Sequence, residues 1–334
     1  MKQTLTNRHS PLPLNHSKTL KNRVVVPPMA SETADDRGFV TQETIAHYGR
    51  LAKSKAALIM VEYSFVHPTG KSEERQLGIS EDSQIPGLAQ VAEEIHLHGA
   101  LAAIQLTHAG GKTEKKFSAG IMQSPSGIIV PVKDQLLESP AVMTLEEIQG
   151  WKDSFKAAAL RAVAAGFDLV ELHAAHGYGL NQWLSPITNQ RTDHYGGSLT
   201  KNLKLLIEII SEIKTACPGL LLSVRIPGQD FLEGGLSPEA AVTIAKTLEE
   251  NGVDLINVSS GIGGWRRPRS RTGEGYLVDE ASFIARQIRT PVIGVGGIES
   301  GDYIDNILGD NRIALAAVGR AILHATKENH LCLK

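Results

Sequence analysis

The chain has 334 residues, of which 42% are hydrophobic and 21% charged, a balance that excludes disordered and fibrous proteins. Its formal net charge of -2 argues against a nucleic-acid-binding surface, and only two cysteines, Cys217 and Cys332, exclude a disulfide framework or an iron–sulfur cluster. The first twenty residues lack an apolar run of signal-peptide length, and no later segment approaches the roughly 20 apolar residues of a membrane helix. We therefore expect a cytoplasmic protein that does not cross a membrane.

Short runs of apolar residues recur along the chain and predict eight buried β-strands. In chain order they cover residues 24–29, 56–63, 101–106, 167–174, 220–227, 254–261, 291–297 and 313–320. Amphipathic stretches between them predict helices at 41–54, 83–98, 144–165, 200–216, 238–251 and 279–288, with shorter ones after 299 and 321. Eight βα units with nearly continuous apolar strands indicate an α/β protein with a (β/α)8 TIM barrel fold.

The predicted barrel forms a single domain over residues 21–334, preceded by an N-terminal arm or cap at 1–20. The residues in excess of a typical barrel of about 250 residues fall mainly in 107–142 and 175–198. These segments follow the third and fourth strands, so the elaborated loops are expected on the catalytic face of the barrel.

Glycines follow the last two strands and predict a phosphate site. Gly296 and Gly297 follow strand seven, and Gly319 with Arg320 follows strand eight. Backbone amides at glycines can approach a phosphate closely, and a guanidinium adds charge-assisted hydrogen bonds. The alternative is a tight turn beside a solvated arginine.

Two polar residues on strands point toward a planar polar ligand. Arg225 follows the alternating Leu221 and Ser223, so it is expected in the barrel mouth, where a guanidinium needs a negative partner. A ligand could supply that partner, or Arg225 could form a salt bridge with Glu171 or Glu62. Gln105 could pair with an amide or imide edge, or could simply anchor a loop.

The densest group of candidate catalytic residues lies at the end of strand four: His173, His176 and Tyr178. The histidines could donate hydrogen bonds to a carbonyl or phenolate oxygen, ligate a metal or belong to the core. No third metal ligand is apparent, so we favour hydrogen-bond donation and predict no metal. Tyr178 stays protonated at neutral pH and could deliver a proton to a carbanion-like centre.

Four arginines fall within residues 266–271, after strand six. This loop is expected to overhang the catalytic face, where Arg267 and Arg269 could bind the phosphates of a nicotinamide nucleotide or an acidic substrate. The alternative is a solvated basic loop or a contact in a homo-oligomer.

From Lys21 through Arg320 the sequence resembles the Old Yellow Enzyme family of FMN-dependent NAD(P)H oxidoreductases, in its shorter bacterial form. The likeness rests on the cluster at the end of strand four and on the motifs Pro27-Pro28-Met29, Gln105-Leu-Thr-His108-Ala-Gly110, Leu184-Ser-Pro186, Asn189-Gln-Arg191-Thr-Asp193-His-Tyr195-Gly-Gly197-Ser198 and Val295-Gly-Gly297.

The resemblance implies a site for noncovalent FMN, reduced by NAD(P)H, in the barrel mouth. Its phosphate would lie at the glycines and Arg320, and its pyrimidine edge near Gln105 and Arg225. The residues implied to line the cofactor site are Pro28, Met29, Ala30, Tyr63, Gln105, Arg225, Gly296, Gly297, Gly319 and Arg320. His173 and His176 would hold the oxygen of an α,β-unsaturated carbonyl, quinone or nitro compound, and Tyr178 would protonate the α-carbon in a ping-pong cycle.

Several positions depart from the family pattern. Ala30 stands where many short-form members have a redox-tuning cysteine, and Glu32 where a tyrosine is common. Tyr63 stands where a small residue next to the flavin is usual, and Gly111 replaces the arginine of the HAGRK pattern. Two alternative functions therefore stay open: a lyase or aldolase-type barrel using the same phosphate site, and a flavin-binding protein with little turnover.

Overall fold

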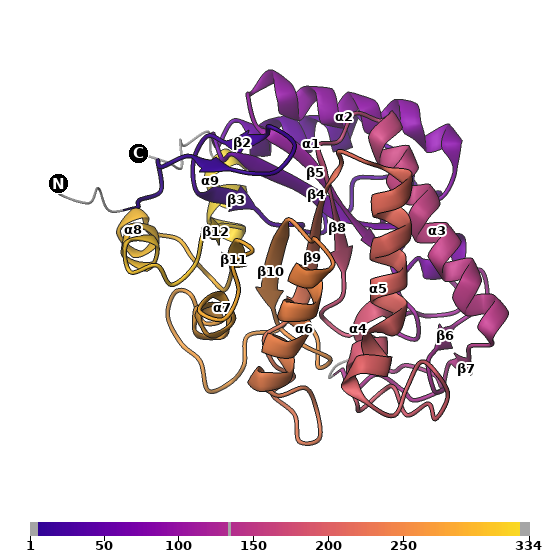
Figure 1. The fold of residues 1–334 in the computed structure, drawn as a ribbon. Coiled ribbons are helices and arrows are strands. Elements are labelled where there is room, and N and C mark those ends of the chain that lie inside the picture. Colours follow the sequence, from indigo (N-terminus) through magenta and orange to yellow (C-terminus); the bar gives the residue numbers. More distant parts are fainter. Residues whose placement is uncertain (1–5, 133–134, 328–334) are drawn as a thin grey trace.

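The computed structural model describes residues 6–132 and 135–327, and its centre is a closed barrel of eight parallel strands (Figure 1). The strands neighbour each other in chain order, and the last pairs with the first through Ala316 and Val24. They are β3 (Val24–Val26), β4 (Leu58–Phe65), β5 (Leu101–Thr107), β8 (Leu169–His173), β9 (Leu221–Pro227), β10 (Leu255–Ser259), β11 (Val292–Gly294) and β12 (Leu315–Ala317). The predicted TIM barrel is confirmed.

Helices connect the strands and surround the barrel (Figure 1). The eight that follow the barrel strands are α1 (Gln42–Ala52), α2 (Ile85–Leu97), α3 (Leu145–Ala164), α5 (Leu199–Ala216), α6 (Pro238–Glu250), α7 (Val278–Ala285), α8 (Gly301–Gly309) and α9 (Arg320–Lys327). Local sequence signals set their ends: Thr144 and Glu147 cap each other reciprocally at the start of α3. No helix within the described residues is long and apolar enough to cross a membrane.

The core has two parts because successive strand residues point to opposite faces. On β4, Ile59 and Val61 belong to the large cluster between strands and helices. Leu58 and Met60, one residue out of step with them, belong to a second cluster inside the barrel. This apolar cluster fills one end of the barrel, so the polar side chains described below lie toward the other.

A short N-terminal hairpin packs on the apolar end of the barrel. Strands β1 (Leu12–Pro13) and β2 (Thr19–Leu20) pair antiparallel, and Leu20 is buried in the interior cluster. Lys18 Nζ lies 2.5 Å from Asp168 Oδ1, just before β8. The catalytic face is therefore the opposite end. The division into an arm at 1–20 and a barrel at 21–334 stays a prediction, and residues 1–5 and 328–334 lie outside the described residues.

Three of the observed strands end three residues earlier than predicted. β3 ends at Val26 because Pro27 and Pro28 have no N–H to continue a ladder. β11 ends at Gly294, and Gly296 and Gly297 follow with φ of 124° and 67°. β12 ends at Ala317, before Gly319 and Arg320. Each early ending leaves loop backbone at the catalytic face, where it can contact a ligand.

The elaborated loops contain elements that the sequence analysis did not predict. After β5, strands β6 (Gln123–Ser124) and β7 (Ala141–Val142) pair in parallel away from the barrel. After β8, the short helix α4 (Gly179–Leu184) begins directly after Tyr178, its N-cap residue. Short 3-10 helices, η1 (Pro68–Gly70) and η2 (Asp82–Gln84), follow β4. In Figure 1, α4, β6 and β7 all lie at the end of the molecule away from β2.

Candidate active site

A cavity of about 530 Å³ opens at the carboxyl ends of the barrel strands. Its lining brings together all the predicted site residues except Arg269: Pro28, Met29, Ala30, Tyr63, Gln105, His173, His176, Tyr178, Arg225, Arg267, Gly296, Gly297, Gly319 and Arg320. Residues from every barrel strand or the loop after it thus meet in one place. This is the expected position of an active site in a TIM barrel.

A polar layer crosses the barrel interior beneath this cavity. The buried carboxylate of Glu171 accepts hydrogen bonds from Gln105 Nε2 at 2.8 Å, Ser223 Oγ at 2.8 Å and Asn257 Nδ2 at 3.0 Å. Burial raises the pKa of the Glu171 carboxyl, and the charge of Arg225 offsets part of that rise. Four strands are therefore tied together below the site.

The next layer, two residues further along the same strands, forms the floor of the cavity. His173 follows Glu171, Arg225 follows Ser223, and Ser259 follows Asn257, as the alternation of side chains in a strand requires. Ser259 Oγ lies 3.2 Å from Arg225 Nη2 and 2.7 Å from His176 Nε2. Ser259 therefore links the arginine to one of the histidines.

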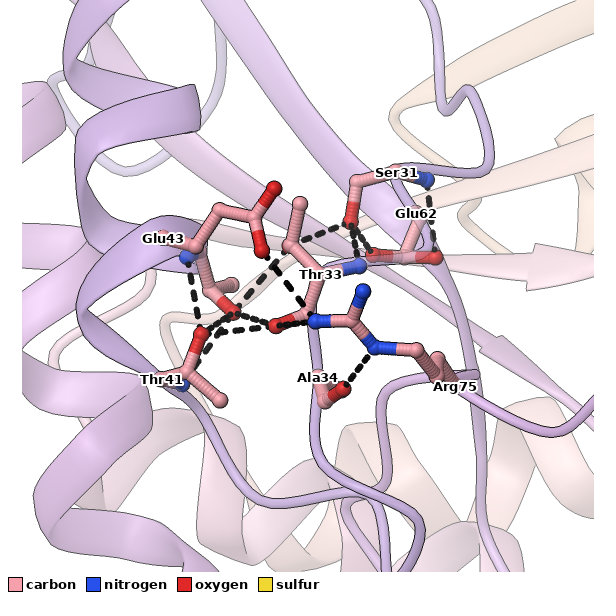
Figure 2. Close-up of polar contacts among 8 residues, drawn as sticks. Ser31, Thr33, Ala34, Thr41, Glu43, Glu62 and Arg75 are labelled. Carbon is pink, nitrogen blue, oxygen red and sulfur yellow. Dashed lines mark hydrogen bonds and ion pairs between the residues drawn. The ribbon is translucent and has the colours of Figure 1, made fainter.

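Glu62, one of the predicted alternative partners of Arg225, points elsewhere. The pairing of β4 with β5 shifts register between Val61 and Tyr63, so Glu62 is the extra residue of a bulge. Its carboxylate accepts hydrogen bonds from the backbone N–H and hydroxyl of Ser31, as Figure 2 shows, and lies 3.5 Å from Tyr48 Oη. The other alternative partner, Glu171, is held by the amides and hydroxyl of the polar layer. The charge of Glu171 still acts on Arg225, and the Nε of Arg225 has no partner among the described residues, so this guanidinium can contact a ligand.

Four buried polar atoms of cavity-lining residues have no hydrogen-bond partner among the described residues: Gln105 Oε1, His173 Nδ1, Arg225 Nε and Ser260 Oγ. Buried polar groups without partners are costly, so atoms of this kind indicate a ligand. A flavin fits them, because its pyrimidine edge offers an N–H to the Gln105 oxygen and acceptor atoms to the Arg225 guanidinium. Gln105 and Arg225 would therefore hold the ring.

The other end of the cavity is shaped for a phosphate group by glycine backbone. A β-carbon on Gly296 would lie 2.9 Å from Leu277 N, and one on Gly319 would lie 3.0 Å from Met29 Sδ. A side chain at either position would crowd its neighbours. Arg320 lines the same region and begins α9, so a guanidinium and a helix N-terminus both favour an anion there. This geometry supports the predicted phosphate site.

The two histidines and Tyr178 form one aromatic group at the cavity. The His173 ring centroid lies 5.0 Å from that of His176 and 4.9 Å from that of Tyr178. Burial, followed by the charge of Arg225, lowers the pKa of both histidines well below the usual value, so both rings are neutral at pH 7. Burial also raises the pKa of Tyr178, which keeps its proton. All three side chains are therefore neutral and can each donate a hydrogen bond to a ligand.

Lys112, which the sequence analysis did not single out, contacts both His176 and Tyr178 of this group. Its Nζ donates a hydrogen bond to His176 O at 2.8 Å and lies 4.1 Å from the centroid of the Tyr178 ring. His176 has φ of 61°, a left-handed conformation that costs a non-glycine residue roughly 1–3 kcal/mol. Burial lowers the pKa of the Lys112 ammonium to about 8. The sequence signal was its place as the lysine of the HAGRK pattern, directly after Gly111.

The arginine-rich loop contributes one residue to the cavity. The Arg267 guanidinium lies 4.5 Å from the centroid of the Tyr276 ring and lines the cavity with Trp265. Arg271 instead forms ion pairs with Asp279 and Glu280. Arg269 is exposed and does not line the cavity, so its predicted role in binding a nucleotide remains untested.

Comparisons with known proteins agree with this geometry. The sequence model of the NADH:flavin oxidoreductase / NADH oxidase family matches residues 9–327. An NADPH dehydrogenase of Halalkalibacterium halodurans is 42% identical over 306 residues, which are 91% of this chain and 88% of that protein.

Among solved structures, morphinone reductase in complex with tetrahydroNAD superposes with a TM-score of 0.80 at 24% identity, covering 97% of this chain and 91% of the other. A 2-naphthoyl-CoA reductase complex superposes with a TM-score of 0.88 at 24% identity and covers 97% of this chain. The present chain spans about half of that longer one, 52% of its length.

The family match covers nearly the whole chain and includes every strand of the barrel. It confirms the predicted enzyme class, an FMN-dependent NAD(P)H oxidoreductase, and the predicted cofactors. The chain belongs to the NADH:flavin oxidoreductase / NADH oxidase family, which is the Old Yellow Enzyme family.

Proposed function

We propose that the protein is an ene-reductase, which takes hydride from NAD(P)H and reduces the activated C=C bond of α,β-unsaturated carbonyl compounds. The observation that carries the proposal is the group of two neutral histidines and a protonated tyrosine at the cavity that fits FMN. FMN, when bound, supplies the hydride that is delivered to the β-carbon of the substrate.

The histidines bind the carbonyl oxygen of the substrate. A neutral imidazole has one N–H, so His173 and His176 together can donate two hydrogen bonds to one acceptor. His176 Nε2 is bonded to Ser259, which leaves Nδ1 for the substrate. Negative charge develops on the carbonyl oxygen as hydride arrives at the β-carbon, and hydrogen bonds aimed at that oxygen stabilise the transition state.

Tyr178 donates a proton to the α-carbon and so completes the reduction. Its buried phenol stays protonated at neutral pH, and its ring lies beside that of His173, which places donor and carbonyl-binding groups together. Positioned proton transfer contributes about 10²- to 10⁴-fold to a rate.

The nicotinamide nucleotide and the substrate use the same cavity in turn, which gives a ping-pong cycle. Support comes from the cavity volume of about 530 Å³ and from morphinone reductase, whose similar fold binds tetrahydroNAD. Arg267 would bind the nucleotide phosphates at the rim. Quinones and nitro compounds are further oxidants under this proposal, and homo-oligomer formation and a cytoplasmic location remain predictions.

An anaerobic spectrum tests the proposal. The purified protein should be yellow, lose its absorbance near 450 nm with NADPH or NADH, and regain it when 2-cyclohexenone is added. Product analysis should give cyclohexanone. If NAD(P)H bleaches the flavin and oxygen restores it but cyclohexenone and related enones do not, the ene-reductase proposal is wrong.

A further inference from the structure

Tyr63 places a second phenol at the active site, on a strand whose register directs it there. The bulge at Glu62 brings Tyr63 opposite Gln105 on β5, and Gln105 points into the barrel mouth. Neighbouring residues in register on paired strands point to the same face, so Tyr63 points into the cavity as well. Its side chain is nevertheless only 8% exposed.

Tyr63 contacts Tyr178, the proposed proton donor. Their ring centroids lie 5.3 Å apart at an interplanar angle of 36°, and both residues line the cavity. Burial raises the pKa of the Tyr178 phenol, and the neighbouring Tyr63 hydroxyl offsets part of that rise. Together with Ala109 they form a separate small cluster of buried residues. The two phenols therefore pack as a unit.

Charged and polar groups contact this pair from the other sides. The Lys112 ammonium lies 4.1 Å from the centroid of the Tyr178 ring. Burial raises the pKa of both phenols, and the charge of Glu73 raises it further. Glu73 lines the cavity and is partly exposed. Glu73, Tyr63 and Tyr178 thus all line the same cavity, with the partly exposed Glu73 on the side of solvent.

We propose that Tyr63 is a positioning residue for Tyr178, which stabilises the phenolate formed when Tyr178 gives up its proton and returns a proton to it from the rim. This inference rests on the proposed function. The O–H bond of Tyr178 breaks as a C–H bond forms at the α-carbon, and the phenolate then accepts a hydrogen bond from Tyr63. Water at the Glu73 rim supplies the proton that restores both phenols, so no further reactant is needed.

The test replaces the Tyr63 hydroxyl while keeping its ring, with Tyr63→Phe. Tyr195→Phe is a matched control, because Tyr195 is as buried as Tyr63 but does not line the cavity, and its Oη donates a hydrogen bond to Glu208 at 2.9 Å. Loss of a hydrogen bond to a charged oxygen should slow flavin reoxidation by 2-cyclohexenone about 10- to 100-fold. Bleaching by NADPH and the dissociation constant for FMN, measured on the same variant, should change several-fold less than flavin reoxidation, because the Tyr63 ring is kept.

A double mutant shows whether Tyr63 acts through Tyr178. In a Tyr178→Phe background, Tyr63→Phe should add less than about twofold to the loss, since its partner is gone. If Tyr63→Phe slows flavin reoxidation by a further 10-fold in the Tyr178→Phe background, the proposal is overturned. An unchanged rate of flavin reoxidation in Tyr63→Phe alone would also overturn it.

A spectroscopic measurement tests the contact without turnover. With ¹³Cζ-labelled tyrosine in the holoenzyme, the Tyr178 signal is assigned by its disappearance in Tyr178→Phe. It should shift in Tyr63→Phe and not in Tyr195→Phe. An unmoved signal would overturn the proposal even if enones oxidise the enzyme. If wild type fails to react with any enone, the proposed function fails, and this signal still decides the contact between the two phenols.

Discussion

The two ends of the cavity are built in different ways. At the proposed phosphate end, Gly296, Gly297 and Gly319 shape the site with backbone. A β-carbon on Gly296 would lie 2.9 Å from the backbone nitrogen of Leu277, and one on Gly319 would crowd the flexible side chain of Met29. At the proton-donor end, Tyr63 and Lys112 reach Tyr178 from different strands or loops through ring and charge contacts. The first arrangement tolerates little change, whereas the second can be altered one side chain at a time. The cofactor site can thus be kept while the chemistry on the substrate changes.

Tyr178→Phe should have the largest effect, and it should affect flavin reoxidation by the substrate far more than flavin reduction by NADPH. Removing the proton donor is expected to slow flavin reoxidation by 2-cyclohexenone about 10²- to 10⁴-fold, while bleaching by NADPH is nearly unchanged. Stopped-flow absorbance near 450 nm measures both reactions. A variant that loses both equally would show that Tyr178 shapes the whole cavity and does not act only at its substrate end.

Removal of either histidine should weaken the binding of phenols, which mimic the developing enolate. His173→Ala or His176→Ala should raise the dissociation constant of 4-chlorophenol roughly 10- to 100-fold, because each deletes a hydrogen bond to a charged oxygen. Titration of the long-wavelength charge-transfer band gives this constant. Unchanged binding in the double variant would assign the histidines to the core.

At the opposite end, Arg320→Ala should weaken FMN binding with little effect on phenol binding to enzyme saturated with FMN. A lost charge-assisted hydrogen bond to phosphate corresponds to roughly a 10- to 100-fold increase in the dissociation constant. Recovery of flavin fluorescence on dilution measures the release. If Arg320→Ala retains FMN as tightly as wild type, the phosphate lies elsewhere.

Glu62 does not line the cavity, and its buried carboxyl gives a prediction about the stability of the fold. Burial raises the pKa of its carboxyl from 4.5 to about 7. Between these values the unfolded chain loses the proton and the folded protein keeps it, so stability falls as the pH rises through this window. Glu62→Gln removes the effect, and its stability relative to wild type should rise by up to about 3 kcal/mol between pH 4 and pH 8.

Urea unfolding of wild type and Glu62→Gln at the two pH values measures this difference. A relative stability that is constant or falls with pH would contradict the placement of Glu62 in the pocket formed by Ser31 and Tyr48.

The arginine-rich loop gives the smallest predicted effect and an internal control. Arg267→Ala should raise the apparent dissociation constant for NADPH a few-fold, more at low salt than at high salt, because Arg267 lines the cavity. Arg269→Ala should change it less, since Arg269 does not. Reductive kinetics at two ionic strengths distinguish the variants. An equal effect of both would indicate a general basic surface.

The sequence predicted the barrel because its strands carry local signals, and local signals also indicated the glycines and Arg320 that line one end of the cavity. Apolar runs mark the strands, and Gly296 and Gly297 mark a turn that few other residues could adopt. The proton-donor end was predicted in part: Tyr178 lies in a motif, but its contacts with Lys112 and Tyr63 join distant segments. The bulge at Glu62 sets the direction of Tyr63, and no local pattern revealed this change of register.

The origin of the two hydrogens added to the substrate tests the account most directly. Reduction of 2-cyclohexenone by unlabelled NADPH in ²H₂O should place one deuterium at the α-carbon, from the exchangeable Tyr178 proton, and leave hydrogen from the nicotinamide at the β-carbon. Mass spectrometry and ²H NMR of the cyclohexanone locate the label. Deuterium absent from the α-carbon, or a product reduced at the carbonyl to the allylic alcohol, would contradict the account.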